Sequence, residues 1–126
     1  MAEMSFREAI RNAMADAMRE DNDVVLMGED LRGGKGGTNP DPDVEAFGGV
    51  FGVTEGLWTE FGDDRVIDTP ITESAIMGLA AGSALTGLRP VAELMFMDFL
   101  ACATTSSITK PPSSATCSAV KQQLHW

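Results

Sequence analysis

The chain has 126 residues, of which 44% are hydrophobic, and this is enough for one domain with a packed core. Its formal net charge is −10 and its sequence isoelectric point is near 4.3, so we expect no nucleic-acid partner, because the phosphates would be repelled. No apolar run reaches the roughly 18 residues of a membrane span, and the first residues, MAEMSFREAI, lack the apolar core of a secretory signal. We therefore expect no membrane association.

The cysteines and the histidine restrict the possible chemistry. Cys102 and Cys117 form neither a close pair nor a zinc-binding spacing, which fits a reducing, cytoplasmic location. The single histidine, His125, lies almost at the end of the printed sequence. The sequence therefore predicts no Ser-His or Cys-His nucleophile in the folded body and no metal site on this chain.

An amphipathic helix is predicted over residues 6–20. Ser5 and Glu8 have the spacing of a capping box, in which the serine oxygen and the glutamate carboxylate each bind an N–H group at the helix start. An apolar stripe follows at helical spacing and comprises Ile10, Ala13, Met14, Ala17 and Met18.

Three strands are predicted, over residues 24–27, 65–68 and 91–96. The first is an all-apolar run, typical of a parallel strand covered on both faces, and it is followed by the tripeptide GED. Helices are predicted between them, over residues 55–60 and 73–86. Strand–helix–strand order implies right-handed crossovers and an α/β fold.

A long loop, residues 32–49, is dense in glycine, proline and aspartate. Its Gly33-Gly34-Lys35 invites comparison with a phosphate-binding loop. The Walker pattern requires serine or threonine after the lysine, however, and Gly36 stands there. The preferred interpretation is a solvated loop.

The helix predicted over residues 73–86 consists largely of small residues. Such a helix can approach another backbone closely, either inside one domain or at a subunit interface, and the sequence leaves both interpretations open. Gly87 is predicted to end this helix, and Pro90 prevents its continuation. Asp98 is predicted to cap a following helix.

Glu73 is the first candidate for chemistry. It opens a helix just after the strand at residues 65–68, and α/β proteins place functional groups at such positions. A glutamate at a helix N-terminus is also stabilised by the helix dipole, by roughly 0.3–1 kcal/mol, without any ligand. On the residues alone, this simpler interpretation is favoured.

The composition changes at residue 103. All 19 acidic residues lie between Glu3 and Asp98, whereas residues 103–126 are rich in serine and threonine and are predicted to form a polar, disordered tail. A second interpretation is a frameshift. Read from the third base of the Ala103 codon, permitted codons give YDQLHHQAAKLRYMFGGQATTAL, which has helical apolar spacing and a Gly-Gly stop. We predict that the tail is out of frame.

A set of motifs connects the chain with a known family. They are MSFREAIRNAM, VVLMGED, GGVFGVTEGL, FGDDRVIDTPITE, GLAAGSALTGLRPVAE and MFMDFL. Together they resemble the N-terminal part of the β subunit of thiamine-diphosphate-dependent 2-oxoacid dehydrogenases, the first components that act on pyruvate, branched-chain 2-oxo acids or acetoin. The glycine-rich loop resembles that of the acetoin-type members. The out-of-frame string resembles the next segment of the family.

The resemblance implies a fold and its limits. It implies a parallel-sheet thiamine-diphosphate-binding fold that is incomplete here, with residues 1–102 as the N-terminal part of a pyrimidine-binding domain and residues 103–126 as the tail. The second domain of the β subunit would lie beyond the region covered. The chain alone is therefore expected to be poorly folded and inactive.

The resemblance also implies site residues. Glu73, in the motif DTPITE, would contact N1′ of the aminopyrimidine ring, and Thr72 replaces the usual serine of this motif. Met95 and Phe99 would pack against the pyrimidine, and Glu29 would line an acidic passage between cofactor sites. Without the family context, Met95 and Phe99 could be ordinary core residues and Glu29 a common strand-end acid.

Cofactor and partners are implied in the same way. The family uses thiamine diphosphate to decarboxylate a 2-oxo acid and passes the acyl group to a lipoyl arm. Its diphosphate-binding signature, with magnesium, sits on the α subunit and is absent from this sequence. The implied partners are an α subunit, in an assembly of two α and two β chains, and a lipoyl-bearing acyltransferase. The alternative is a non-catalytic acidic α/β interaction protein, or a pseudogene fragment, with a disordered tail.

Overall fold

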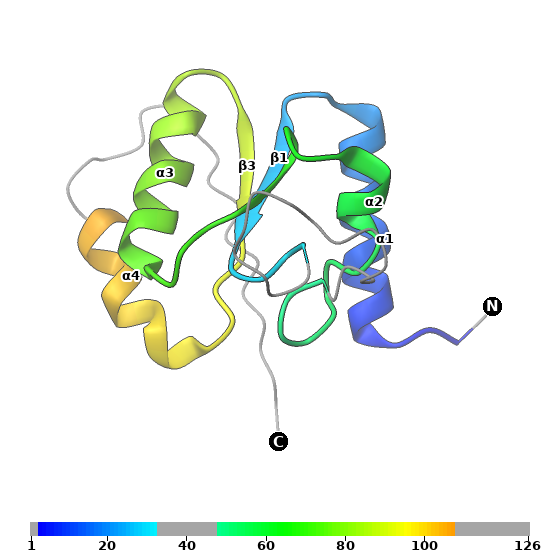
Figure 1. Ribbon diagram of the computed structural model, residues 1–126, viewed down its shortest axis with the longest axis horizontal. Coiled ribbons are helices and arrows are strands. Elements are labelled where there is room, and N and C mark those ends of the chain that lie inside the picture. The colour runs from blue at the N-terminus through cyan, green and yellow to red at the C-terminus, as the bar shows by residue number, and fades with distance from the viewer. Residues whose placement is uncertain (1–2, 33–47, 108–126) are drawn as a thin grey trace.

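The computed structural model describes residues 3–32 and 48–107. A three-stranded sheet lies between two pairs of helices (Figure 1). In chain order the elements are α1 (Phe6–Glu20), β1 (Val24–Gly28), α2 (Leu57–Phe61), β2 (Val66–Asp68), α3 (Glu73–Leu85), β3 (Arg89–Ala92), the 3₁₀ turn η1 (Met97–Phe99) and α4 (Leu100–Ser107).

All three strands are parallel, in the order β2-β1-β3. Met27 of β1 pairs with Ile67 of β2 and with Ala92 of β3, so the carboxyl ends of the strands lie at one edge of the sheet. Helices α1 and α2 lie on one side of the sheet, and α3 and α4 lie on the other (Figure 1). This arrangement confirms the predicted α/β class.

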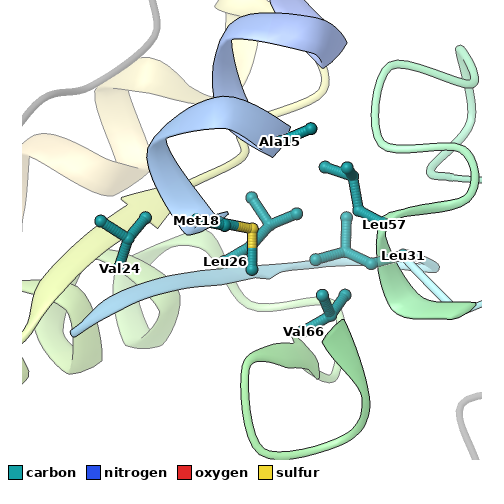
Figure 2. Close-up of a cluster of buried hydrophobic side chains, with 7 residues drawn as sticks. All are labelled: Ala15, Met18, Val24, Leu26, Leu31, Leu57 and Val66. Carbon is teal, nitrogen blue, oxygen red and sulfur yellow. The ribbon is translucent and has the colours of Figure 1, made fainter. Parts of the chain in front are cut away.

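Alternate residues of β1 enter two separate hydrophobic cores. Figure 2 shows the core on the α1 side, where Leu26 packs with Met18 and Leu57. The core on the α3 side contains Met27 and Ile76. Strand β1 is therefore buried on both faces, as its uninterrupted apolar sequence predicts.

Helix α1 has the predicted bounds and the predicted capping box. The Ser5 N–H donates to the Glu8 carboxylate at 2.7 Å, and the Glu8 N–H donates to Ser5 Oγ at 3.3 Å. The apolar stripe is only partly covered, because Ala13 and Ala17 are exposed. Together with the sheet it lines an open apolar groove of about 290 Å³, which we call the α1 groove: Ile10, Ala13, Met14, Ala17, Met18, Val24, Leu26 and Val91.

The third strand differs from the prediction. Instead of residues 91–96 it comprises Arg89–Ala92. Pro90 is compatible with this position because β3 is an edge strand among the described residues, and an edge strand can lack one N–H donor. Its neighbour β1 ends at Gly28, and the Glu93 N–H makes the last ladder bond, to a β1 carbonyl at 2.9 Å. Beyond that point no described strand is available to pair with.

Helix α3 ends at Leu85, close to the predicted end, in a Schellman motif. Gly87 has a φ of +107°, and its N–H donates to the Ala84 carbonyl at 3.3 Å. The Leu88 N–H donates to the Ser83 carbonyl at 3.2 Å. Glycine adopts this left-handed conformation without steric cost, which is why it ends the helix as predicted.

Helix α4 crosses the predicted boundary at residue 103. It continues to Ser107, and Ala103 is 1% exposed in the core on the α3 side, so residues 103–107 are helical rather than part of a polar tail. Asp98 lies inside η1 and not at the predicted cap position. Most of the predicted glycine-rich loop, residues 33–47, and the predicted tail from residue 108 to residue 126 fall outside the described residues. Within the described ranges, no helix combines the length and the hydropathy needed to cross a bilayer.

Candidate functional site

Three glutamates lie where the sheet meets the start of α3. Glu29 directly follows β1, Glu93 directly follows β3, and Glu73 is the first residue of α3. Because β1 and β3 are parallel neighbours, their carboxyl ends place the first two acids at the same edge of the sheet. Ligands of parallel sheets bind at this edge, which makes the three glutamates the candidate site.

Glu29 is buried, with 7% of its surface exposed. The Thr72 N–H, at the head of α3, donates a hydrogen bond to its carboxylate. Burial raises the pKa of Glu29, and the neighbouring charges of Glu73 and Asp30 raise it further. The structure therefore brings the two predicted acids, Glu29 and Glu73, within electrostatic range of each other.

The turn after Glu29 is fixed by its backbone. Asp30 has a φ of 55°, in the left-handed region that aspartate tolerates better than most residues, and its carbonyl accepts the Gly49 N–H at 3.1 Å. The Arg32 N–H then donates to the Asp68 carboxylate at 3.0 Å, and Arg32 Nε donates to a β2 carbonyl at 2.8 Å. These bonds hold the end of β1 against the end of β2.

Glu93 was not singled out by the sequence. Its pKa is raised to about 7, chiefly by burial and then by the charge of Glu29. A Cβ added at Gly28 would lie 3.0 Å from Glu93 Cβ, and one added at Gly49 would lie 3.1 Å from the Glu93 carboxylate oxygens. A side chain at either glycine would therefore crowd this acid. The sequence feature that could have identified Glu93 is its position directly after β3, which matches the position of Glu29 directly after β1.

Glu73 is half-buried at the first turn of α3. Among the described residues its carboxylate has no hydrogen-bond or salt-bridge partner. The next residue fixes the helix start, because Ser74 Oγ donates to the Cys102 carbonyl of α4 at 2.6 Å. Glu73 is consequently held by its backbone while its acidic group remains available.

Met95 and Phe99 lie on the segment that joins β3 to α4. Met95 is half-buried and follows β3 instead of lying in a strand, and Phe99 is 41% exposed in η1. Phe96, which the sequence analysis did not select, stacks edge-to-face with both Phe51, at 5.4 Å between ring centroids, and Phe99, at 5.9 Å. This segment packs through α4 against α3, the helix that Glu73 opens.

Large apolar side chains near this site are unusually exposed. Ile71 is 84% exposed just before α3, and Phe96, Met97 and Leu100 are each at least 40% exposed. Neighbouring apolar side chains left in water commonly mark a surface that a ligand or partner covers. In the described parts of the chain, no three His, Cys, Asp or Glu residues are grouped so that they could hold a metal ion.

Comparison with known proteins decides the family. The family described as "Transketolase, pyrimidine binding domain" matches residues 2–117. The chain belongs to this family. The match confirms the fold expected from the resemblance.

Two relatives are the β subunits of acetoin:2,6-dichlorophenolindophenol oxidoreductase from Bacillus subtilis, 55% identical over 97 residues, and from Cupriavidus necator, 47% identical over 97 residues. A third is the pyruvate dehydrogenase E1 component subunit beta of Staphylococcus epidermidis, 48% identical over 100 residues. These matches cover 77–79% of this chain but only 27–28% of the relatives. The chain thus spans little more than a quarter of their length.

Proposed function

We propose that this pyrimidine-binding domain is the N-terminal part of the β subunit of a 2-oxoacid dehydrogenase first component of the acetoin or pyruvate type. The observation that carries the proposal is Glu73, a half-buried acid at a helix head with no partner among the described residues, in a domain whose relatives are such β subunits. Its proposed ligand is N1′ of the aminopyrimidine ring of thiamine diphosphate.

The residues present fit an aminopyrimidine. A ring nitrogen requires one hydrogen-bonding acid, and Glu73 supplies an unpaired carboxylate. A flat ring also requires apolar cover, and half-buried Met95 with partly exposed Phe99 would supply it. The exposed apolar surface around them would then be buried by the ring and by a partner subunit.

Each residue has a distinct part in this proposal. When bound, thiamine diphosphate supplies the electron sink for decarboxylation of a 2-oxo acid. Glu73 holds a proton at N1′ and fixes the ring's orientation. Met95 and Phe99 exclude water, which strengthens the Glu73 contact because the local dielectric falls. Glu29, whose pKa is raised by burial and by Glu73, lines a passage along which a proton can be exchanged.

The site is proposed to be shared with other chains. We infer that an α subunit supplies magnesium and the diphosphate-binding residues, in an assembly of two α and two β chains. A lipoyl-bearing acyltransferase would accept the acyl group. The location would be cytoplasmic, and the 126-residue chain alone would be inactive.

The tail remains a separate proposal. We infer that the coding sequence changes frame near Ala103, because the other frame can encode a segment with helical apolar spacing. Sequencing the DNA through codons 100 to 130 tests this. An uninterrupted frame whose codons do not allow the alternative string would overturn it.

Cofactor binding tests the function. The test protein is a chimera of the Bacillus subtilis β subunit in which residues 1–102 of this chain replace the matching segment. It is produced together with the α subunit of the Bacillus subtilis enzyme. We expect Glu73→Gln to weaken binding of thiamine diphosphate roughly 10- to 150-fold, because a charge-assisted hydrogen bond is lost. Glu20→Gln, at the exposed end of α1, is the control and should bind as the parent does.

A chimera that assembles with the α subunit and binds thiamine diphosphate equally well with glutamine at position 73 would contradict the proposed role. A chimera that folds but never assembles would favour the acidic interaction protein instead.

A further inference from the structure

A small cavity lies on the α1 side of the sheet, away from Glu73. It has a volume of about 20 Å³ and lies between α1, the carboxyl ends of β1 and β3, and the segment before α2. Its walls are mostly apolar and include Ile10, Met14 and Leu26. Two polar side chains, Thr54 and Glu93, complete the lining.

Both polar side chains carry a buried oxygen that lacks a partner. Thr54 is 1% exposed, and its Oγ1 has no hydrogen-bond partner among the residues that the structure describes. Glu93 Oε2 is also buried and has no partner among them. Native proteins pair nearly all such atoms, with protein groups or with internal water. Two unpaired oxygens in the wall of one cavity therefore point to a common ligand.

The size of the cavity selects that ligand. A cavity needs roughly 10–15 Å³ of accessible volume and two to four polar partners to hold one water molecule. The cavity beside Thr54 has about 20 Å³ and two such partners. An organic molecule would need more space than this, and a bound Mg²⁺ or Ca²⁺ would need about six oxygen ligands instead of two.

The backbone around Glu93 builds the site. Gly28 and Gly49 both lie so close to Glu93 that a Cβ at either position would crowd it, at 3.0 and 3.1 Å. Thr54 is fixed from the other side, because its N–H donates to the Gly48 carbonyl at 3.0 Å. The two oxygens are thus presented to the cavity by rigid backbone.

We propose that Thr54 and Glu93 form a binding site for one internal water molecule. The water bridges Thr54 Oγ1 and Glu93 Oε2 and ties the segment before α2 to the end of β3. This inference is independent of the proposed function, because it involves neither Glu73 nor a cofactor.

The water also affects the acid that binds it. Among the described residues, the charged group that acts on Glu93 is Glu29. A water that donates to the Glu93 carboxylate stabilises its charged form, so loss of the water raises the pKa of Glu93 further.

The test uses the β-subunit chimera that carries residues 1–102, because the 126-residue chain alone is expected to be poorly folded. The chimera without further substitution is called the wild-type chain below, and it is compared with two variants at one position. In a high-resolution crystal structure, the wild-type chain should show one water at about 2.7–3.2 Å from both oxygens. Thr54→Val keeps the shape but removes the hydroxyl, and should lose the water. Thr54→Ser keeps the hydroxyl and should retain it.

A solution measurement distinguishes the site from simple packing. The pH midpoint of the Glu93 titration is measured from the carboxyl-carbon NMR signal. It should be higher in Thr54→Val than in the wild-type chain and should be unchanged in Thr54→Ser. An empty cavity in the wild-type chain, a direct Thr54–Glu93 hydrogen bond, or an unchanged midpoint in Thr54→Val would overturn the proposal. So would a wild-type chain without a cooperative unfolding transition.

Discussion

Burial raises the pKa of Glu29, and the charge of Glu73 raises it further, although the two acids come from the end of a strand and the start of a helix far apart in the sequence. The Thr72 N–H, which precedes Glu73 directly, donates to the Glu29 carboxylate and holds the two together. Burial and this neighbouring charge both favour the protonated form of Glu29. This coupling is the physical basis for treating the head of α3 as a site.

Glu93 makes the stability of the domain depend on pH. Its pKa is raised from the ordinary 4.5 to about 7, so the folded state binds its proton more tightly than the unfolded state does. Stability from this group is present below pH 4.5 and is lost as the pH rises to about 7. The loss is at most on the order of 3 kcal/mol.

We therefore expect Glu93→Gln to be more stable than the wild-type chain at pH 8, and the difference to shrink as the pH is lowered. Denaturant unfolding between pH 4 and 8 measures this. Glu20→Gln, at an exposed position on α1, is the matched control and should leave the profile unchanged. A stability difference for Glu93→Gln that is independent of pH would contradict the assignment.

The close approach of Gly28 to Glu93 predicts a second effect. Gly28→Ala would place a Cβ 3.0 Å from Glu93 Cβ, and overpacking of this kind costs roughly 1–3 kcal/mol of unfolding free energy. Gly82→Ala is the matched control, because Gly82 lies in α3 with no atom within 4 Å of an added Cβ. It should stabilise the chain by roughly 0.5–1 kcal/mol, since alanine favours the helix. Equal changes in the melting temperature of Gly28→Ala and Gly82→Ala would contradict the crowding at Gly28.

The α1 groove predicts that the isolated chain binds apolar dyes. Ala9 and Ala17 are both exposed on α1, but only Ala17 lines the groove. Ala17→Glu should lower the fluorescence of a bound anilinonaphthalene dye, because it places a charge in the groove, whereas Ala9→Glu should not. If both variants bind the dye as the wild-type chain does, the groove is closed in solution.

The sequence predicted those parts of the fold that depend on neighbouring residues. The capping box Ser5–Glu8 set the start of α1, and Gly87 set the end of α3, because the chemistry of a helix end is local. The predicted end of β3 was wrong. It depends on where β1 stops pairing, and this relationship between distant segments cannot be read from residues 91–96 alone.

The residues of the candidate site were also predicted where their signal is local and missed where it depends on distant segments. Glu73 and Glu29 were recognisable because each lies at the end of a predicted element. Glu93 was missed, because its importance comes from the register that places it beside Gly28 and from its burial against the segment before α2. Helix α4 was missed past residue 103, because serine and threonine do not mark a helix whose stability comes from packing against α3.

Glu73 is proposed to hold a proton at the cofactor ring, and decarboxylation of a 2-oxo acid by the chimera paired with its α subunit measures this role most directly. We expect Glu73→Gln to lower the turnover number roughly 10²- to 10⁴-fold, the usual contribution of a positioned acid–base group, while the assembly stays intact. Glu20→Gln should leave the rate unchanged. Undiminished decarboxylation by an intact Glu73→Gln assembly would contradict the account.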